Sequence, residues 1–294
     1  MEKESNNLYT YNKAILLGNG FDVANGFPTR YQDFIEDSRF KDLLLDDNQL
    51  AKHIRRSYEE AKWVDIEIEI GKYSANLEKE FTGASFEKET NRFKVEYNNL
   101  SDALYWYINS LIGGKHNPKM AELMNNWKNS LCGNIPEQAF FVSFNYLRWD
   151  LNEIYNNMFK EKFVNNDPLF IHGITTYNQN DKPQIVLGVD ENSEYCKKHH
   201  FIVKSFNKYN QADIYFKHIF NANHIIIFGC SIGKTDQRYF KKLFSHAVGK
   251  TFEIYYYGEK EETNIRANVA ALCDFDDLMT NNIVIFRDSS DYSL

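Results

Sequence analysis

The chain has 294 residues, a net charge of −7 and an isoelectric point near 5.7. This length suffices for one large α/β domain, or for one domain that carries an insertion. Contacts with a phosphate backbone need clustered Lys and Arg, and the sequence has no basic stretch. The composition therefore argues against a protein that binds nucleic acid.

Cysteine spacing and the N-terminal stretch exclude further classes. The 4 cysteines are scattered and form no CxxC pair, so we expect no metal site and no dithiol motif. The stretch MEKESNNLYTYNK has no apolar signal region, and no apolar run approaches the roughly 20 residues of a membrane helix. We therefore expect a cytoplasmic protein without a membrane partner.

Short runs of β-branched and aromatic residues, bounded by turn residues, predict the strands. Several runs are apolar at consecutive positions, which indicates strands that are buried on both faces of a parallel sheet. The predicted strands span residues 13–18, 139–144, 168–172, 184–188, 224–229, 252–257 and 283–287.

A long helical stretch separates the first two predicted strands. Thr29 and Gln32 fit a capping box at its start. One crossover does not need so much chain, so we predict a helical insertion at residues 40–135 within a nucleotide-binding domain formed by residues 1–39 and 136–294. The predicted helices of this stretch span residues 30–37, 49–61, 64–81, 86–112 and 117–131.

From residue 224 onward, strands alternate with predicted helices at 235–247 and 262–272. This alternation predicts a doubly wound sheet. The expected fold class is α/β: a Rossmann-like, largely parallel sheet flanked by helices, with an α-helical insertion. Ligands of such sheets bind at the carboxyl ends of the strands, so polar residues just past those ends are the candidates for chemistry.

The first candidates lie in the stretch LLGNGFD. Gly18 and Gly20 allow a sharp turn and a close approach of backbone N–H groups to a ligand, with Asn19 between them. A tight turn without a ligand explains the same spacing equally well. The carboxylate of Asp22 would repel a pyrophosphate but accept hydrogen bonds from ribose hydroxyls; alternatively, it caps the short turn.

Three later strands also end at polar residues. Asn145 follows AFFVSF and either orients a water or ribose hydroxyl or caps the next helix. His172 ends PLFIH and either acts as a general base or is structural. Gly229 ends HIIIFG, Ser231 can donate a hydrogen bond to an anion, and Asp236 stands where the next helix begins, a position typical of a cap.

These motifs resemble the AbiH family of bacterial abortive-infection proteins. The resemblance runs in family order from residue 15 to about residue 240. It implies an effector of antiviral, antiphage defence. The matching stretches are LLGNGFDVANGFPTRYQDF, WVDIEIEI, FNY at 144–146, IHG at 171–173, LGVD at 187–190 and GCSIGKTDQRYF.

More distantly, the order of motifs is similar to the sirtuin-type fold. In antiphage members of that superfamily an Asn and a His carry NAD hydrolysis, and they match Asn145 and His172, the expected catalytic residues. The glycine turn matches Gly18 and Gly20, and the late serine matches Ser231. The tetrapeptide NGFD replaces the usual Ala-Gly-x-Ser, and zinc cysteines are missing.

Three functions remain open. The first is hydrolysis of the N-glycosidic bond of NAD or a related nucleotide, with no further cofactor, in which His172 and Asn145 activate water or a hydroxyl and Asp22 holds the sugar. The second is a nucleotide-binding sensor or toxin module without hydrolysis. The third is a metal-dependent nuclease or nucleotide-phosphate hydrolase that uses Asp22, Asp65, Glu67 and Asp190. Alternatively, Asp65 or Glu67 faces solvent or pairs with a nearby Lys.

The partners expected from these functions are a small nucleotide, a phage-derived trigger and, in a homo-oligomer, a second copy of the chain. The residues expected to bind the nucleotide are Gly18, Asn19, Gly20, Asp22, Gly229, Ser231 and Asp236.

Overall fold

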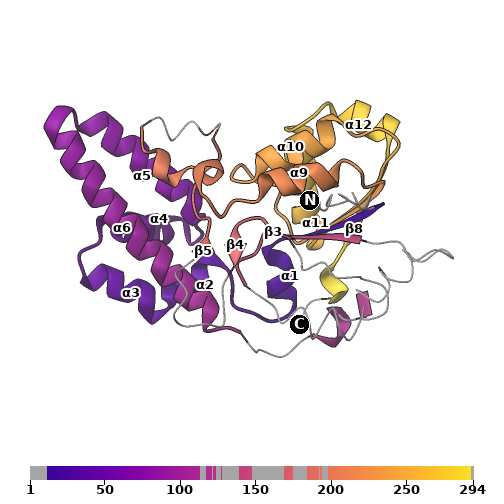
Figure 1. Ribbon diagram of the computed structural model, residues 1–294. Coiled ribbons are helices and arrows are strands. Elements are labelled where there is room, and N and C mark those ends of the chain that lie inside the picture. Colours follow the sequence, from indigo (N-terminus) through magenta and orange to yellow (C-terminus); the bar gives the residue numbers. More distant parts are fainter. Residues whose placement is uncertain are drawn as a thin grey trace, which may run out of the picture.

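The computed structural model describes residues 12–112, 117–120, 122–123, 127, 139–147, 169–174, 184–191, 193 and 198–292. A six-stranded parallel sheet with helices on both faces lies on one side, and a group of long helices lies on the other (Figure 1). The predicted α/β, Rossmann-like class is therefore confirmed.

The sheet is doubly wound. Its strand order is β3-β2-β1-β6-β7-β8, and each neighbouring pair is parallel. The order reverses at β1, which has β2 on one side and β6 on the other, so the switch point where such sheets bind ligands lies between β1 and β6. The strands are β1 (Lys13–Leu17), β2 (Ala139–Ser143), β3 (Leu169–Phe170), β6 (His224–Phe228), β7 (Thr251–Tyr256) and β8 (Ile283–Asp288).

Consecutive apolar residues in these strands serve two separate cores. In β1, Ala14 and Leu16 face the core that holds α9 (Ala212–Ile219), α10 (Gln237–Ser245), α11 (Gly258–Ala270) and α12 (Phe275–Asn281). Ile15 and Leu17 face the opposite core, which includes α1 (Asn19–Ala24). Because both faces are covered, the strand is apolar at four consecutive positions, from Ala14 to Leu17, as predicted.

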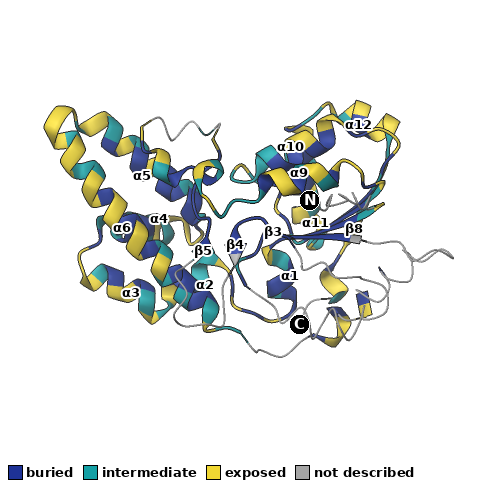
Figure 2. Ribbon diagram, in the orientation of Figure 1, coloured by how far each residue is buried: buried dark blue, intermediate teal, exposed yellow. Residues whose placement is uncertain are grey.

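The second core continues from the sheet into the helical group. Phe34 packs edge-on against Phe40 and lies 5.5 Å from the ring of Tyr107. In Figure 2 the buried faces of these helices turn inward and their exposed faces turn outward. The group comprises α2 (Tyr31–Glu36), α3 (Ser38–Leu45), α4 (Gln49–Ala61), α5 (Ile66–Glu80) and α6 (Gly83–Asn109).

Several local expectations were wrong or incomplete. The capping box of Thr29 and Gln32 does not form, because α2 begins after Arg30, whose N–H donates to the carboxylate of Asp33 (3.0 Å). The hydroxyl of Thr29 donates instead to Asn19 (2.5 Å). Helices α3, α9 and α12 were not predicted, since each is short and polar on one side.

Two further predictions concern strand pairing and domain limits. Residues 184–188 do not join the main sheet; β5 (Gln184–Ile185) pairs antiparallel with β4 (Gly173–Ile174). The insertion limits at residues 40 and 135 stay a prediction, and the second limit lies outside the described residues. In the part of the chain that the structure describes, no helix combines the length and apolarity needed to span a bilayer.

Candidate functional site

The glycine turn after β1 is held by backbone contacts with the end of β6. The amide of Gly18 donates to the carbonyl of Phe228, and the amide of Gly20 donates to the carbonyl of Gly229, both at 2.9 Å. A Cβ on Gly18 would lie 2.5 Å from the Gly229 oxygen. The glycines therefore permit two backbones to touch, and both amides are already used and do not cradle a phosphate.

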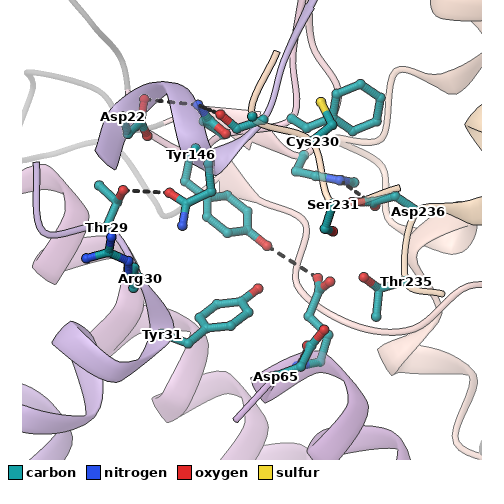
Figure 3. Close-up of a pocket in the computed structure, with 18 of the residues that line it drawn as sticks. Asp22, Thr29, Arg30, Tyr31, Asp65, Tyr146, Cys230, Ser231, Thr235 and Asp236 are labelled. Atoms are coloured by element: carbon teal, nitrogen blue, oxygen red, sulfur yellow. Dashed lines mark hydrogen bonds and ion pairs between the residues drawn. The ribbon is translucent and has the colours of Figure 1, made fainter. Parts of the chain in front are cut away.

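A cavity of about 370 Å³ opens at the carboxyl ends of β1, β2 and β6 (Figure 3). The structure brings every sequence-predicted site residue to its wall, although they come from four separate parts of the chain. Helix α5 and the loop before it close the cavity from the helical side. The predicted residues on the wall are Gly18, Asn19, Gly20, Asp22, Asn145, His172, Gly229, Ser231 and Asp236.

Asp22 and Asn145 form one buried pair in this wall. The Asn145 Nδ2 donates to the Asp22 carboxylate (2.9 Å) and to the Gly18 carbonyl (3.1 Å). Because both partners are acceptors, the amide orientation is fixed. Gly18, and not Asp22, precedes the first turn of α1, so the interpretation of Asp22 as a helix cap is wrong. The Asn145 Oδ1 is buried and has no partner among the described residues.

His172 is almost fully buried, at 3% exposure, and its Nε2 lies 2.9 Å from a carboxylate oxygen of Asp236. Burial and the nearby ammonium of Lys204 lower the pKa of His172, although Asp236 acts in the opposite direction. The ring is therefore neutral at pH 7 and donates from Nε2 to the carboxylate. Its Nδ1 remains as an acceptor, and no described residue binds it.

Asp236 does not cap α10, since its side chain accepts no hydrogen bond from the first turn of that helix. Its Oδ1 instead binds His172 and the ammonium of Lys204, the latter at 2.9 Å. Burial alone would raise the pKa of Asp236, but Lys204 and His172 together hold it below its ordinary value. Asp236 is thus an ionised carboxylate that fixes the tautomer of the imidazole.

Lys204 connects this pair to the helical group. Its Nζ donates to Glu67 of α5 (2.7 Å), to Asp236 and to the carbonyl of Thr235 (3.2 Å), so its three protons are all used. Burial raises the pKa of Glu67 to about 8, although Lys204 opposes the rise. One buried ammonium therefore serves two carboxylates, of which Asp236 is the more acidic.

Two tyrosines line the space between these groups. The hydroxyl of Tyr146 donates to the carbonyl of Val186 (3.2 Å) and lies 3.5 Å from Glu67, and Figure 3 shows Tyr31 across from Tyr146. Burial is the main cause, and the charge of Glu67 the second, that raises the pKa of each phenol well above its ordinary value. Both therefore remain neutral groups that can donate and accept hydrogen bonds.

Sequence reasoning did not find Lys204 and considered Glu67 as a metal ligand or as a residue that faces solvent or pairs with an unspecified Lys nearby in the sequence. The available signal was a charged residue inside an apolar run: Lys204 in FIVKSF and Glu67 in IEIEI. Such residues are rarely buried unless they are paired, so two of them predict a buried ion pair. Their separation of 137 residues hid which charge meets which.

Asp22, Asp65 and Glu67 of the metal hypothesis are bound to other groups, and Asp190 does not line the cavity. Asp65 accepts the N–H groups of Glu67 and Ile68 and so caps α5. Glu67 binds Lys204, whose ammonium would repel a divalent cation. Within the described ranges, no three His, Cys, Asp or Glu side chains are placed to hold a metal ion.

Proteins with a doubly wound sheet form a class that binds ligands, nucleotides among them, at the switch point of the sheet. The polar cavity of this protein lies at the same position. A family model described as bacteriophage abortive infection AbiH matches residues 14–257, which is most of the chain. The protein belongs to this family, as its motifs indicated, and thus to the proteins of phage abortive infection. Among curated proteins, none matches the chain.

Proposed function

We propose that this protein binds NAD or a related nucleotide and hydrolyses the bond between the ribose and its base. The observation that carries the proposal is the meeting of His172 and Asn145 in one cavity at the switch point. Each has a buried acceptor atom, Nδ1 and Oδ1, that the described part of the protein leaves without a partner. Two such acceptors suit a water molecule or a sugar hydroxyl.

Each group has one role in the proposed reaction. Departure of the base leaves oxocarbenium-like positive charge on the ribose. His172 takes a proton at Nδ1 from the attacking water or a hydroxyl, and Asp236 stabilises the imidazolium that forms. Asn145 orients the same proton donor through Oδ1, and Asp22 holds the amide in place. General acid–base catalysis of this kind contributes about 10²–10⁴-fold to a rate.

The test is incubation of the purified protein with NAD and chromatography of nicotinamide and ADP-ribose. We expect His172→Ala and Asn145→Ala each to slow release by about 100-fold or more. His246→Ala is the matched control, because His246 is exposed, hydrogen-bonds to the carbonyl of Lys242 and does not line the cavity. The same variants are compared in phage-infected cells, where a trigger is present. An undiminished NAD level in infected cells that carry the unaltered protein would refute the proposal.

A nucleotide sensor without hydrolysis is the second candidate. Glu67 of α5 reaches Lys204 and thereby Asp236 and His172, so ligand occupancy has a direct connection to the helical group. Saturable nucleotide binding, with intact NAD in both purified protein and infected cells, would favour this function.

A further inference from the structure

A second cavity, of about 620 Å³, lies on the other side of the glycine turn, at the end of β7. It shares a wall with the first cavity, so the two form adjoining chambers that meet along one seam. We call them the His172 chamber and the tyrosine chamber, the latter for Tyr255, Tyr256 and Tyr257 in its wall. The shared wall consists of Asn19, Gly20, Arg30, Gly229, Cys230 and Ser231.

The seam between the chambers offers hydrogen-bond donors. Arg30 is exposed there, and no carboxylate of the described residues forms an ion pair with its guanidinium. Asn19 keeps its amide group on the same wall while its Oδ1 accepts from Thr29, and the hydroxyl of Ser231 lies there too. A guanidinium beside neutral donors fits phosphate oxygens, which it can bind with two parallel hydrogen bonds.

The tyrosine chamber suits a planar base. Tyr257 is 60% exposed, although it lines a cavity, and Tyr256 beside it is half-buried. Exposed aromatic faces inside a cavity are surfaces on which a nucleobase stacks. The carboxylate of Glu261 is in the same wall and can accept hydrogen bonds from ribose hydroxyls.

We propose that the two chambers together bind one dinucleoside diphosphate. The reactive ribose and its base occupy the His172 chamber, the diphosphate lies at Arg30, and the second nucleoside stacks on Tyr257. This assignment of the reactive half rests on the proposed function. Each chamber has the size of a small-molecule site, and together they exceed what one mononucleotide would fill.

Calorimetric titration with ADP-ribose and with nicotinamide mononucleotide tests the proposal, because only the first probe reaches both chambers. We expect ADP-ribose to bind at least about 10-fold more tightly. Tyr257→Ala should weaken ADP-ribose by about 10-fold and leave the mononucleotide unchanged. Arg30→Ala should weaken both by about 10-fold or more, since each carries phosphate, and Arg30→Lys should weaken them less.

Phe206→Ala is the matched control, since Phe206 is 64% exposed and lies in the wall of neither chamber. All variants are at exposed positions, and unchanged melting temperatures verify their folding. Equal affinity for the two probes, or ADP-ribose binding that Tyr257→Ala does not alter, would overturn the dinucleotide proposal and leave hydrolysis standing. Tight, Tyr257-dependent ADP-ribose binding without release of nicotinamide in infected cells would keep this proposal and overturn hydrolysis.

Discussion

The glycine turn and the charge network occupy the same cavity but are built in opposite ways. The turn is a short continuous stretch whose amides contact the end of β6, and it depends on the absence of side chains. The network takes Glu67, His172, Lys204 and Asp236 from four distant segments and depends entirely on side chains. The amides of the turn therefore serve its packing against the end of β6, while its Gly18 carbonyl and Asp22 hold Asn145. The charge network holds the other candidate catalytic residue, His172.

The largest expected effect breaks the network. Lys204→Met removes the ammonium that two buried carboxylates share, and loss of one partner of a buried ion pair costs about 3–5 kcal/mol of unfolding free energy. Chemical denaturation at pH 8 measures the loss. It should shrink at pH 6, where a proton on Glu67 replaces part of the lost charge.

Lys250→Met is the control for this experiment. Lys250 is also buried, but its ammonium binds the carbonyls of Phe220 and Ala222 and, among the residues that the structure describes, no carboxylate. We expect a smaller loss, about 1–2 kcal/mol, without the difference between pH 6 and pH 8. Equal losses for the two lysines would mean that the ion pairs of Lys204 add nothing.

The next effect tests the turn. Gly229 has φ +68°, and a Cβ there would lie 2.5 Å from the amide nitrogen of Phe21. Gly229→Ala should therefore lower the unfolding free energy by about 3 kcal/mol, from conformational strain and from separation of the two backbones. Gly258→Ala has a similar φ of +75° with open space around the Cβ, so it should cost about 1 kcal/mol. If the two variants lose similar amounts of unfolding free energy, the close backbone contact of Gly229 contributes nothing beyond its positive φ.

A third prediction separates orientation from binding. The neutral amide of an Asp236→Asn variant holds the Nε2–H tautomer of His172 less firmly than the carboxylate does and does not stabilise the imidazolium. Turnover should therefore fall by about 100-fold. The acid limb of the remaining activity should move to lower pH, because the charge of Asp236 no longer raises the pKa of His172. Asp213→Asn, on the exposed side of α9, should leave turnover and profile unchanged. A variant that loses affinity alone would assign Asp236 to ligand binding.

The smallest effect, measured per pH unit, is a pH dependence of stability. The folded chain binds the Glu67 proton up to about pH 8, whereas the ordinary value for this carboxyl is 4.5. The folded state therefore holds more protons in this window, and its unfolding free energy falls as pH rises from about 4.5 to about 8. Glu67→Gln should flatten this fall by up to about 1 kcal/mol per pH unit.

Glu69→Gln provides a control of opposite sign on the same helix. Burial opposes ionisation of Glu69, but hydrogen bonds from His53, Lys72 and Ser57 lower its pKa to about 2. Its contribution is complete above about pH 4.5 and is lost as pH falls toward 2, so the variant should lose a constant amount of unfolding free energy above about pH 5, and its difference from the unaltered protein should vanish toward pH 2. Parallel curves for both variants above pH 5 would refute the assignment for Glu67.

Local pattern predicted the sheet and the place of the site. Buried strands read as continuous apolar runs, and the polar residues after them were found on one wall because parallel strands share a carboxyl edge. The sequence could not show which side chains pair with one another in the site. Asp22 and Asp236 stand where caps are common, and only the fold shows that they bind Asn145 and His172. The partner of Lys204 likewise follows only from the fold, which places α5 beside it.

Helix α6 of the helical group has one side against the core that the sheet and the helical group share, and one side in solvent (Figure 2). Phe93, Leu100 and Tyr105 are fully buried on the first side, whereas Val95 is 59% exposed on the other. Substitutions on the solvent side of α6 should therefore leave the core contacts in place, together with Leu104 and Ile108, which line the cavity from the same helix. The charge and shape of this outer surface can thus change while the form of the cavity is kept.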